Sequence, residues 1–435
     1  MNGVSTVTLL VSGQSLARSI SRIRAVKEQF YPYMPELYAH KLHFLLILKS
    51  MITNAEGVSV TRSMHRWAVG AFFFLQGICF ASWASRIPTI QQRMGFTDAE
   101  LGAVLFAIPT GLMVSLPLSG WLTARLGSRR VVILATLLYG LTLVGVGLAS
   151  SPLLLVAALF VFGFTGNLNN IGINTQAVGV EAQYGRSIMA SFHGLWSLAG
   201  FTGAAIGTGM IALDVAPAWH FGVSCALMAV GVAVGFRWLL TQDVNTDADR
   251  PIFARPDKSL MNLGLLAFCT MICEGAMFDW SGVYFKKVVQ APAAWVGAGY
   301  TAFMCTMAAG RFIADWLTVR LGMKRILQGS GALTAAGLLL SVAFPSMVFA
   351  TLGFLLVGFG VSSGVPLVYS AAGRSKVLSP GVALAAVSTI GFLGFLIGPP
   401  LIGLVAGATS LRVSFTIIAL MGLGIVVISS RAKLS

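Results

Sequence analysis

The chain has 435 residues, of which 10% are charged and 56% are hydrophobic. A soluble protein needs about 25% charged residues to cover its surface, so the composition excludes a soluble globular protein and indicates a chain solvated mainly by lipid. The net charge of +15 would suit nucleic acid, but the basic residues gather in alternate loops between apolar segments, which excludes that partner. The five cysteines lie in apolar segments without a metal-ligand pattern around them, so we expect no metal, no cofactor and no disulfide framework.

Residues 1–65 differ in kind from the rest of the chain. They are basic, and their longest apolar run is too short to cross a bilayer. They predict a disordered N-terminal extension, with a basic amphipathic arm on the membrane surface as the alternative. No short apolar stretch followed by a small-residue cleavage site indicates a signal peptide.

The remaining sequence contains twelve segments that could span a membrane, since each has about 20 mostly apolar residues. They cover 66–86, 99–121, 131–149, 152–178, 188–212, 218–239, 260–284, 294–317, 326–344, 347–370, 381–405 and 411–430. A polar linker, 241–259, separates an N-terminal six-helix bundle, 66–240, from a C-terminal one, 260–430. Residues 431–435 form a short tail.

The basic residues predict the orientation of these spans. One set of loops and both termini carry 23 arginines and lysines, against 5 in the other set, with Arg311 inside a span. Because the richer side of a membrane protein is cytoplasmic, we expect the linker, the tail and both termini in the cytoplasm.

The two sets of six spans repeat each other at an offset of 195 residues. Residues 122–130 have the pattern Leu-Thr-x-Arg-Leu-Gly-x-x-Arg, and residues 317–325 repeat it. Matched glycines continue the repeat on both sides without an insertion. Two copies of one apolar unit joined by a polar linker are typical of transporters whose halves move around a central site.

The segment 120–130, Gly-Trp-Leu-Thr-Ala-Arg-Leu-Gly-Ser-Arg-Arg, resembles the loop signature of the major facilitator superfamily, and its copy at 315–325 lies where that family repeats it. The resemblance covers about residues 66–430. It implies an all-α membrane protein with twelve transmembrane helices in two pseudo-symmetric six-helix bundles, working by alternating access. Segments such as Phe192-His-Gly-Leu-Trp-Ser197 are similar to the YbjJ-like bacterial inner-membrane branch near the sugar permeases.

The chain departs from this family at the cytoplasmic loops. The family usually has an acidic residue before the first arginine of the signature, which helps to close the cytoplasmic side, but here Ala124 and Val319 occupy those positions. Asp315 is the candidate replacement, because it lies one helical turn from Arg311 and the two can pair. We assign a cytoplasmic gate to Arg125, Arg130, Glu181, Arg311, Asp315, Arg320 and Arg325. Glu181 is also expected to anchor a basic loop.

Glu274 is the clearest ionisable residue within a span. Placing such a residue in a bilayer costs about 3 kcal/mol or more of free energy, which indicates a functional or structural role for it. Removal from water favours the neutral, protonated carboxyl group, which is the property that a proton carrier requires. We interpret Glu274 as the proton-coupling residue, and the alternative is a hydrogen bond that stabilises the bundle.

Asp279 lies near the external end of the same span but on a different face from Glu274. The offset of 195 residues places Arg86 at a matching depth on the first span. An ion pair between Arg86 and Asp279 would form an external gate. Arg86 could instead bind an anionic substrate or extend toward the lipid head groups.

Span four carries Asn167, Asn170 and Asn174 on one helical stripe. Amides in lipid need partners, which are either neighbouring helices or a polar cargo. We predict that this stripe binds the substrate, with helix packing as the alternative.

Three further residues are candidates on other spans. Gln76 lies midway along the first span, and Trp83 lies one turn before Arg86. We group both with the substrate-binding residues, although Trp83 could also anchor the helix at the membrane interface. His193 is a candidate proton relay or, alternatively, a structural histidine.

These features predict a secondary active transporter in the bacterial inner membrane rather than an enzyme, since no phosphate-binding loop is present. The expected cargo is a small polar solute such as a sugar, and we expect protons to drive its transport by a monomer surrounded by lipid. Multidrug or metabolite efflux by proton antiport is the first alternative. A non-transporting membrane sensor or scaffold is the alternative from another class, although the short loops provide no partner-binding domain.

Overall fold

The computed structural model describes residues 62–185, 188–243, 258–373 and 380–432. Most of the predicted N-terminal extension, most of the predicted linker and the last three residues lie outside these ranges.

The first half is entirely helical in the residues described. Its helices are α3 (Arg62–Met94), α4 (Asp98–Leu105), α5 (Ala107–Leu126), α6 (Ser128–Leu148), α7 (Pro152–Tyr184), α8 (Met189–Ala212) and α9 (Pro217–Gly235), followed by the 3-10 turn η3 (Phe236–Trp238). Local sequence explains several starts: Thr97 and Glu100 form a capping box before α4, and Ser151 caps α7 in front of Pro152.

The second half repeats this organisation. Its elements are α10 (Lys258–Lys287), the 3-10 turn η4 (Ala293–Trp295), α11 (Ala298–Leu321), α12 (Met323–Ala343), α13 (Met347–Val361), α14 (Gly364–Gly373), α15 (Pro380–Ala408) and α16 (Leu411–Arg431). No strand occurs in the described part of either half.

Eleven segments of the described chain are long and apolar enough to cross a membrane, and they coincide with eleven of the twelve predicted spans. Here α4 with α5, and α13 with α14, each make one span. The twelfth predicted span, 294–317, coincides with α11, a helix of 24 residues. Arg311 and Arg320 lower the mean hydropathy of α11. The all-helical membrane fold is therefore confirmed, and the eleven candidate spans of the described residues are roughly consistent with the predicted twelve.

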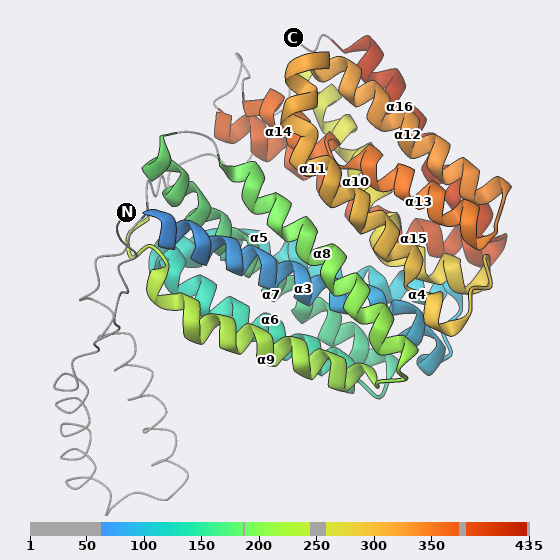
Figure 1. The fold of residues 1–435 in the computed structure, drawn as a ribbon, viewed down its shortest axis with the longest axis horizontal. Coiled ribbons are helices and arrows are strands. Elements are labelled where there is room, and N and C mark those ends of the chain that lie inside the picture. The colour runs from blue at the N-terminus through green and yellow to red at the C-terminus, as the bar shows by residue number, and fades with distance from the viewer. Residues whose placement is uncertain (1–61, 186–187, 244–257, 374–379, 433–435) are drawn as a thin grey trace, which may run out of the picture. The chain divides into compact units, whose positions relative to one another are not determined.

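The two halves share one packing pattern as well as one sequence pattern. α3 packs on α8 as α10 packs on α15, and α5 and α6 pack on α7 as α11 and α12 pack on α13 (Figure 1). Gly127 and Gly322, which are 195 residues apart, both have positive φ angles, 82° and 79°. Glycine adopts this conformation at little cost, so each makes the same sharp turn between two helices.

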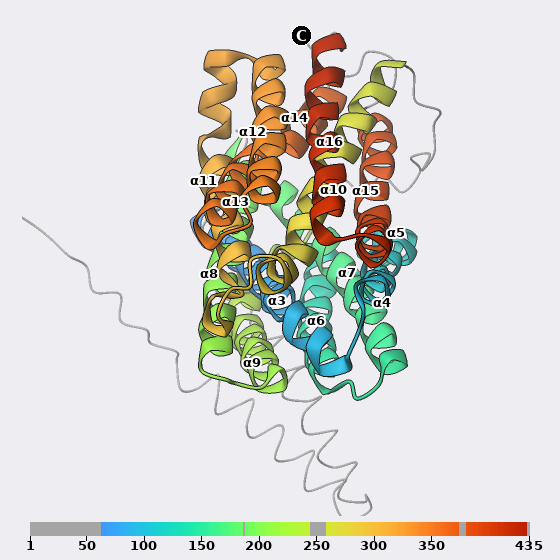
Figure 2. The same ribbon diagram turned by 90° about the vertical axis from the view of Figure 1, so that its right-hand side faces the viewer.

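In the described residues, the halves contact each other mainly along three helix pairs, with a smaller contact between α5 and α15. α8 lies against α11, α4 against α15, and α3 against α10 (Figure 2). We call the end of the helices joined by residues 244–257 the linker end, and the opposite end the distal end. At the distal end α4 crosses α15 so closely that a Cβ on Gly403 would lie 2.6 Å from the Asp98 carbonyl oxygen and 2.8 Å from the Gly102 Cα.

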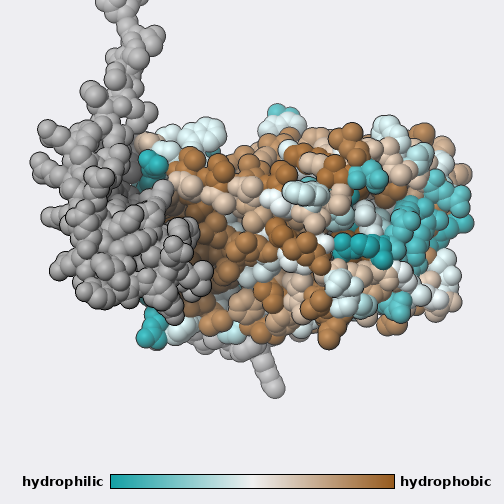
Figure 3. All heavy atoms as spheres, turned by 90° about the horizontal axis from the view of Figure 1, so that it is seen from below, coloured by the Kyte–Doolittle hydropathy of each residue, from teal (hydrophilic) through white to brown (hydrophobic). Residues whose placement is uncertain are grey.

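Large apolar side chains are exposed on most helices, as a lipid-facing surface requires. Figure 3 shows one such face, where apolar residues cover much of the middle and hydrophilic residues gather toward one end.

Candidate functional site

A buried group of polar and charged side chains connects the two halves, and we call it the central charge cluster. Arg311 Nη2 lies 3.1 Å from Glu274 Oε1, and these side chains are only 12% and 7% exposed. Arg311 Nη1 donates to Ser197 Oγ at 2.6 Å. The Arg311 guanidinium also lies 5.7 Å from the ring centroid of Trp196. An arginine and a carboxylate that share a buried site reduce each other's cost of burial.

Four helix positions from three helices supply this cluster. Glu274 is on α10 and Arg311 on α11 of the second half, whereas Ser197 and Trp196 are on α8 of the first half. The end of the Met304 side chain of α11 lies against Gly200 of α8, 2.1 Å from the position that a Cβ on Gly200 would take. The cluster therefore depends on close contact between the halves.

Not every N–H donor of the Arg311 guanidinium has an acceptor in the described structure. Its Nε is buried and has no hydrogen-bond partner among the described residues. Nε and Nη2 lie on the same edge of the guanidinium plane, the edge that can hold both oxygens of a carboxylate. Glu274 accepts from Nη2 alone, so one of the two donors on this edge remains open.

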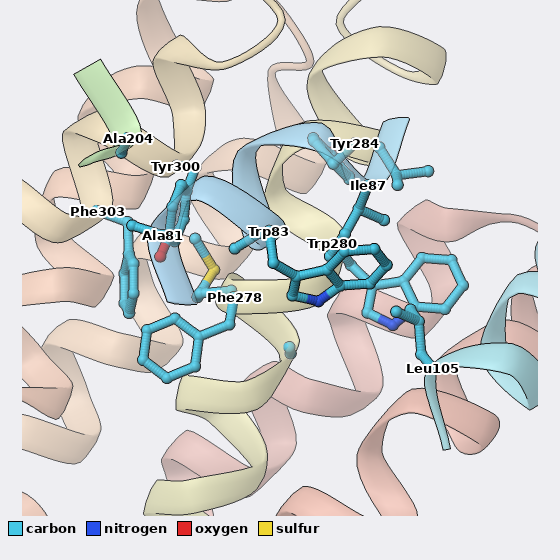
Figure 4. Close-up of a cluster of buried hydrophobic side chains, with 14 of the residues drawn as sticks. Ala81, Trp83, Ile87, Leu105, Ala204, Phe278, Trp280, Tyr284, Tyr300 and Phe303 are labelled. Carbon is cyan, nitrogen blue, oxygen red and sulfur yellow. The ribbon is translucent and has the colours of Figure 1, made fainter. Parts of the chain in front are cut away.

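Aromatic rings from both halves lie next to the cluster. Phe80 of α3 is 5.2 Å from Phe278 of α10 and 6.0 Å from Trp196, and Phe278 is 6.1 Å from Trp196, all measured between ring centroids. Phe278 also contacts the rings of Tyr300 and Phe303. Figure 4 shows Phe278, Tyr300 and Phe303 gathered next to the α3 segment that carries Ala81 and Trp83.

The placement of Arg311 corrects one prediction. We expected Arg311 in a gate at the linker end, paired with Asp315, but its guanidinium instead bonds Glu274 and Ser197. The side chain of Asp315 lies outside the described residues. Sequence spacing favoured the partner one turn away, whereas helix packing brings together residues that are 37 positions apart.

The other gate candidates do lie at the linker end. Arg125 stacks on Trp121 at 5.2 Å, and Arg320 stacks on Trp316 at 4.3 Å, so the same pair occurs once in each half. The tryptophans are 52% and 54% exposed. Arg130 and Arg325 are also exposed.

Glu181 has a different role from these arginines. Its carboxylate accepts hydrogen bonds from the backbone N–H groups of Ile188 and Met189, at 2.7 and 2.8 Å. Because these groups start α8, Glu181 satisfies donors at a helix N-terminus that would otherwise lack partners.

The predicted ion pair between Arg86 and Asp279 is absent from this structure, which contradicts our expectation for the external gate. Arg86 is 2% exposed and donates from Nε to His220 Nδ1 at 3.2 Å and from Nη2 to the Val215 carbonyl at 2.7 Å. Both acceptors belong to the first half. The guanidinium is thus hydrogen-bonded within its own half, where Asp214 is its acidic neighbour, while Asp279 is half-buried on α10.

Other charges connect the halves at the distal end. Lys287 forms an ion pair with Asp98 at 2.5 Å. Lys286 donates to Gln92 Oε1 at 2.5 Å and to the Pro88 carbonyl at 3.4 Å. The sequence places all these residues near the distal loops, but it contains no signal for their pairing across the halves.

The asparagine stripe on α7 divides into two parts. Asn167 is 6% exposed and donates to Ser115 Oγ on α5 at 2.7 Å. This hydrogen bond between α7 and α5 agrees with the helix-packing alternative for Asn167. Asn170 is exposed and accepts a hydrogen bond from Asn174 Nδ2 at 2.7 Å, so this pair remains accessible.

The remaining candidates are largely enclosed. Gln76 donates from Nε2 to the Gly166 carbonyl at 3.2 Å, and Trp83 is buried in the core rather than placed as an interfacial anchor. The ring of His193 meets the ring of Phe73 edge-on at 5.3 Å. Within the described ranges, no three His, Cys, Asp or Glu side chains are arranged to hold a metal ion.

Comparisons with known proteins agree with this fold. The family model described as Major Facilitator Superfamily matches residues 68–376. An uncharacterized MFS-type transporter of Yersinia pestis is 36% identical over 349 residues, covering 80% of this chain and 91% of the relative. Membrane protein MosC of Rhizobium meliloti is 32% identical over 359 residues, covering 82% and 87%.

Among solved structures, the nucleoside transporter NupG aligns with a TM-score of 0.67 at 14% identity, covering 85% of this chain and 100% of that chain. At this identity the likeness shows the fold alone. The narrower resemblance to the YbjJ-like branch stays a prediction. With the family model and the relatives in agreement, the chain is a member of the major facilitator superfamily, a multi-pass membrane protein that transports rather than catalyses.

Proposed function

We propose that this transporter couples the movement of a small polar solute to protons by alternating access. The central charge cluster is the observation that carries the proposal, because it joins a carboxylate–arginine pair of one half to α8 of the other. A proton on Glu274 removes its charge and weakens its pairing with Arg311. Since Arg311 also holds Ser197, protonation changes a contact between the halves, as proton-driven rocking requires.

The two moving bodies in this proposal are residues 66–240 and 260–430, connected by the linker 241–259. The excess of arginine and lysine at the linker end supports a cytoplasmic location for that end and for both termini. The membrane is then the bacterial inner membrane. The exposed Trp121 and Trp316 at the linker end and the tight crossing of α4 with α15 at the distal end support assignment of this structure to an inward-facing state.

The accessible amides are our candidates for binding the solute. Asn170 is exposed and keeps its Nδ2 donor, and the half-buried Asn174 keeps its Oδ1 acceptor, because Asn174 Nδ2 already donates to Asn170. Asn167 is committed to Ser115 in this state, so we move it to a structural role. Gln76 has an unpartnered Oε1 in the described structure and remains a candidate acceptor near the first-half helices.

Efflux of apolar compounds by proton antiport is the second candidate function. The aromatic group formed by Phe80, Trp196 and Phe278 favours it, because such rings bind apolar and cationic compounds without directional hydrogen bonds. The direction of proton-driven movement separates the two functions. In vesicles whose lumen corresponds to the cytoplasm, accumulation of a solute in the lumen supports uptake, and export of the solute from the lumen supports efflux.

A test of proton coupling uses purified protein in proteoliposomes. Solutes are screened for uptake with and without a proton gradient, and the best solute is then measured with Glu274→Gln. We expect the variant to lose about tenfold or more of gradient-driven accumulation, because glutamine cannot carry a proton, but to retain exchange of labelled for unlabelled solute.

Glu100→Gln is the matched control for this test, because Glu100 is exposed and its capping role survives the substitution. It should transport as the unsubstituted protein does. Accumulation that ignores the gradient, or that is unchanged in Glu274→Gln, would rule out Glu274 as the coupling group.

A further inference from the structure

We infer that the cargo carries a carboxylate group, which replaces Glu274 on Arg311 when Glu274 is protonated. The inference rests on the proposed function and names its substrate class. A sugar has no charge to offer, so this class differs from the neutral polar solute that the sequence alone suggests.

Arg311 has an open hydrogen-bond donor that a carboxylate could fill. Nη2 is occupied by a single Glu274 oxygen at 3.1 Å, while Nε on the same edge is buried without an acceptor in the described structure. A carboxylate is the group that fits such an edge with both oxygens. A free carboxylate ligand can adopt the geometry that satisfies both donors, whereas Glu274 is tethered to α10.

The charge balance of the site also favours an anionic cargo. When a proton adds to the Glu274 carboxylate, the acid becomes neutral and Arg311 keeps its positive charge. The described titratable neighbours are His193 on α8, Tyr300 on α11 and Tyr369 on α14, and none of them is an anion at neutral pH. The arginine then needs an anion, since an unpaired buried charge is costly.

Asp279 does not fill this need within the described structure. It follows Glu274 on α10 and its electrostatic neighbour is Tyr300, whereas the acidic neighbour of Arg311 is Glu274. A substrate carboxylate therefore restores neutrality: one proton and one negative charge enter the site together. No covalent bond changes in this exchange except the O–H bond formed on Glu274.

The aromatic rings beside Arg311 favour a particular body for the cargo. Trp196 is partly exposed next to Arg311, and the ring of Phe80, also partly exposed, lies 6.0 Å from the Trp196 ring. Aromatic faces beside a charged anchor favour an organic acid with an unsaturated or apolar body. Sulfate or phosphate would leave these faces without a partner.

The test measures binding in detergent by titration calorimetry, with benzoate and cis,cis-muconate as carboxylates and with benzamide and glucose as neutral probes. We expect a carboxylate to bind about tenfold more tightly at about pH 5.5 than at about pH 8, through its coupling to the proton. Glu274→Gln should bind the carboxylate with equal affinity at both pH values, because the neutral glutamine forms no ion pair with Arg311 at either pH. Arg311→Gln should lose about tenfold or more in affinity.

Lys324→Gln is the matched control, because Lys324 is an exposed base whose ammonium contacts the Ser430 carbonyl far from the cluster. It should bind as the unsubstituted protein does. The inference is overturned if neither carboxylate binds the unsubstituted protein or Glu274→Gln, or if Arg311→Gln binds them normally.

The binding test also separates this inference from the proposed function. Carboxylate binding that depends on Arg311, combined with gradient-independent transport, would keep the binding site and reject proton coupling. Gradient-driven transport of a neutral solute, without carboxylate binding, would keep proton coupling and reject the substrate class.

Discussion

Asn167 and Asn170 lie one turn apart on α7 in different surroundings. Asn167 is buried and bonded to Ser115, whereas Asn170 is exposed. Asn167→Ala should lower the free energy of unfolding by about 1 kcal/mol, a usual magnitude for a hydrogen bond between membrane helices. Asn170→Ala should change it by less than about 0.5 kcal/mol. Unfolding in mixed detergent and SDS measures both changes in the free energy of unfolding. Equal changes for the two variants would contradict the different roles of Asn167 and Asn170.

Single charged residues within spans are more predictable from the sequence than their partners are. Glu274 was recognised because a carboxylate within a span is rare and costly, which is a property of one residue. The pairing of Arg311 with Glu274, and of Arg86 with His220, depends on which helix faces come together. That information arises from tertiary packing and has no local signature.

At the scale of helices, Gly102 and Gly403 set the distance between α4 and α15. A Cβ on Gly403 would overlap the α4 backbone, so Gly403→Ala should cost about 1–3 kcal/mol in this distal-closed state alone. That cost corresponds to about 5- to 150-fold in the population of the state with the distal end open. Distances between spin labels on unnatural amino acids at Ser150 and Thr409, which lie in distal loops of opposite halves, report this population.

Gly120→Ala is the control for the helix crossing, because a Cβ on Gly120 would meet no atom within 4 Å. It should leave the label distances unchanged. If Gly403→Ala also leaves them unchanged, the crossing of α4 and α15 does not determine the distal-closed state.

Helix positions were more predictable than helix contacts. The apolar runs located the spans because lipid requires about 20 apolar residues in each, and the repeat aligned Gly127 with Gly322 at equivalent turns. The break between α4 and α5 at Phe106, inside one predicted span, was not expected. Gly102 matches Gly297 at the offset of 195 residues, but its close approach to Gly403 depends on the other half of the molecule.

At the scale of the whole molecule, the two ends differ in how the halves meet. At the distal end, Lys287 and Asp98 connect them, and α4 crosses α15. At the linker end, each half keeps its own tryptophan–arginine pair, with both tryptophans about half exposed. This asymmetry predicts that the distal contacts must break, and that the exposed tryptophans become covered, when the molecule changes state.

The ion pair between Lys287 and Asp98 should contribute to this balance by a measurable amount. We expect a double-mutant cycle of Lys287→Ala and Asp98→Ala to show a coupling of about 0.5–1 kcal/mol in favour of the distal-closed state, because the pair is partly exposed. High salt should reduce the coupling. The label distances between Ser150 and Thr409 give the populations for each variant.

Arg93→Ala is the control, because Arg93 donates to the Gly147 and Ala149 carbonyls within the first half. This substitution should leave the equilibrium unchanged. Strictly additive effects of the two alanines at low salt would mean that the pair does not hold the distal end closed.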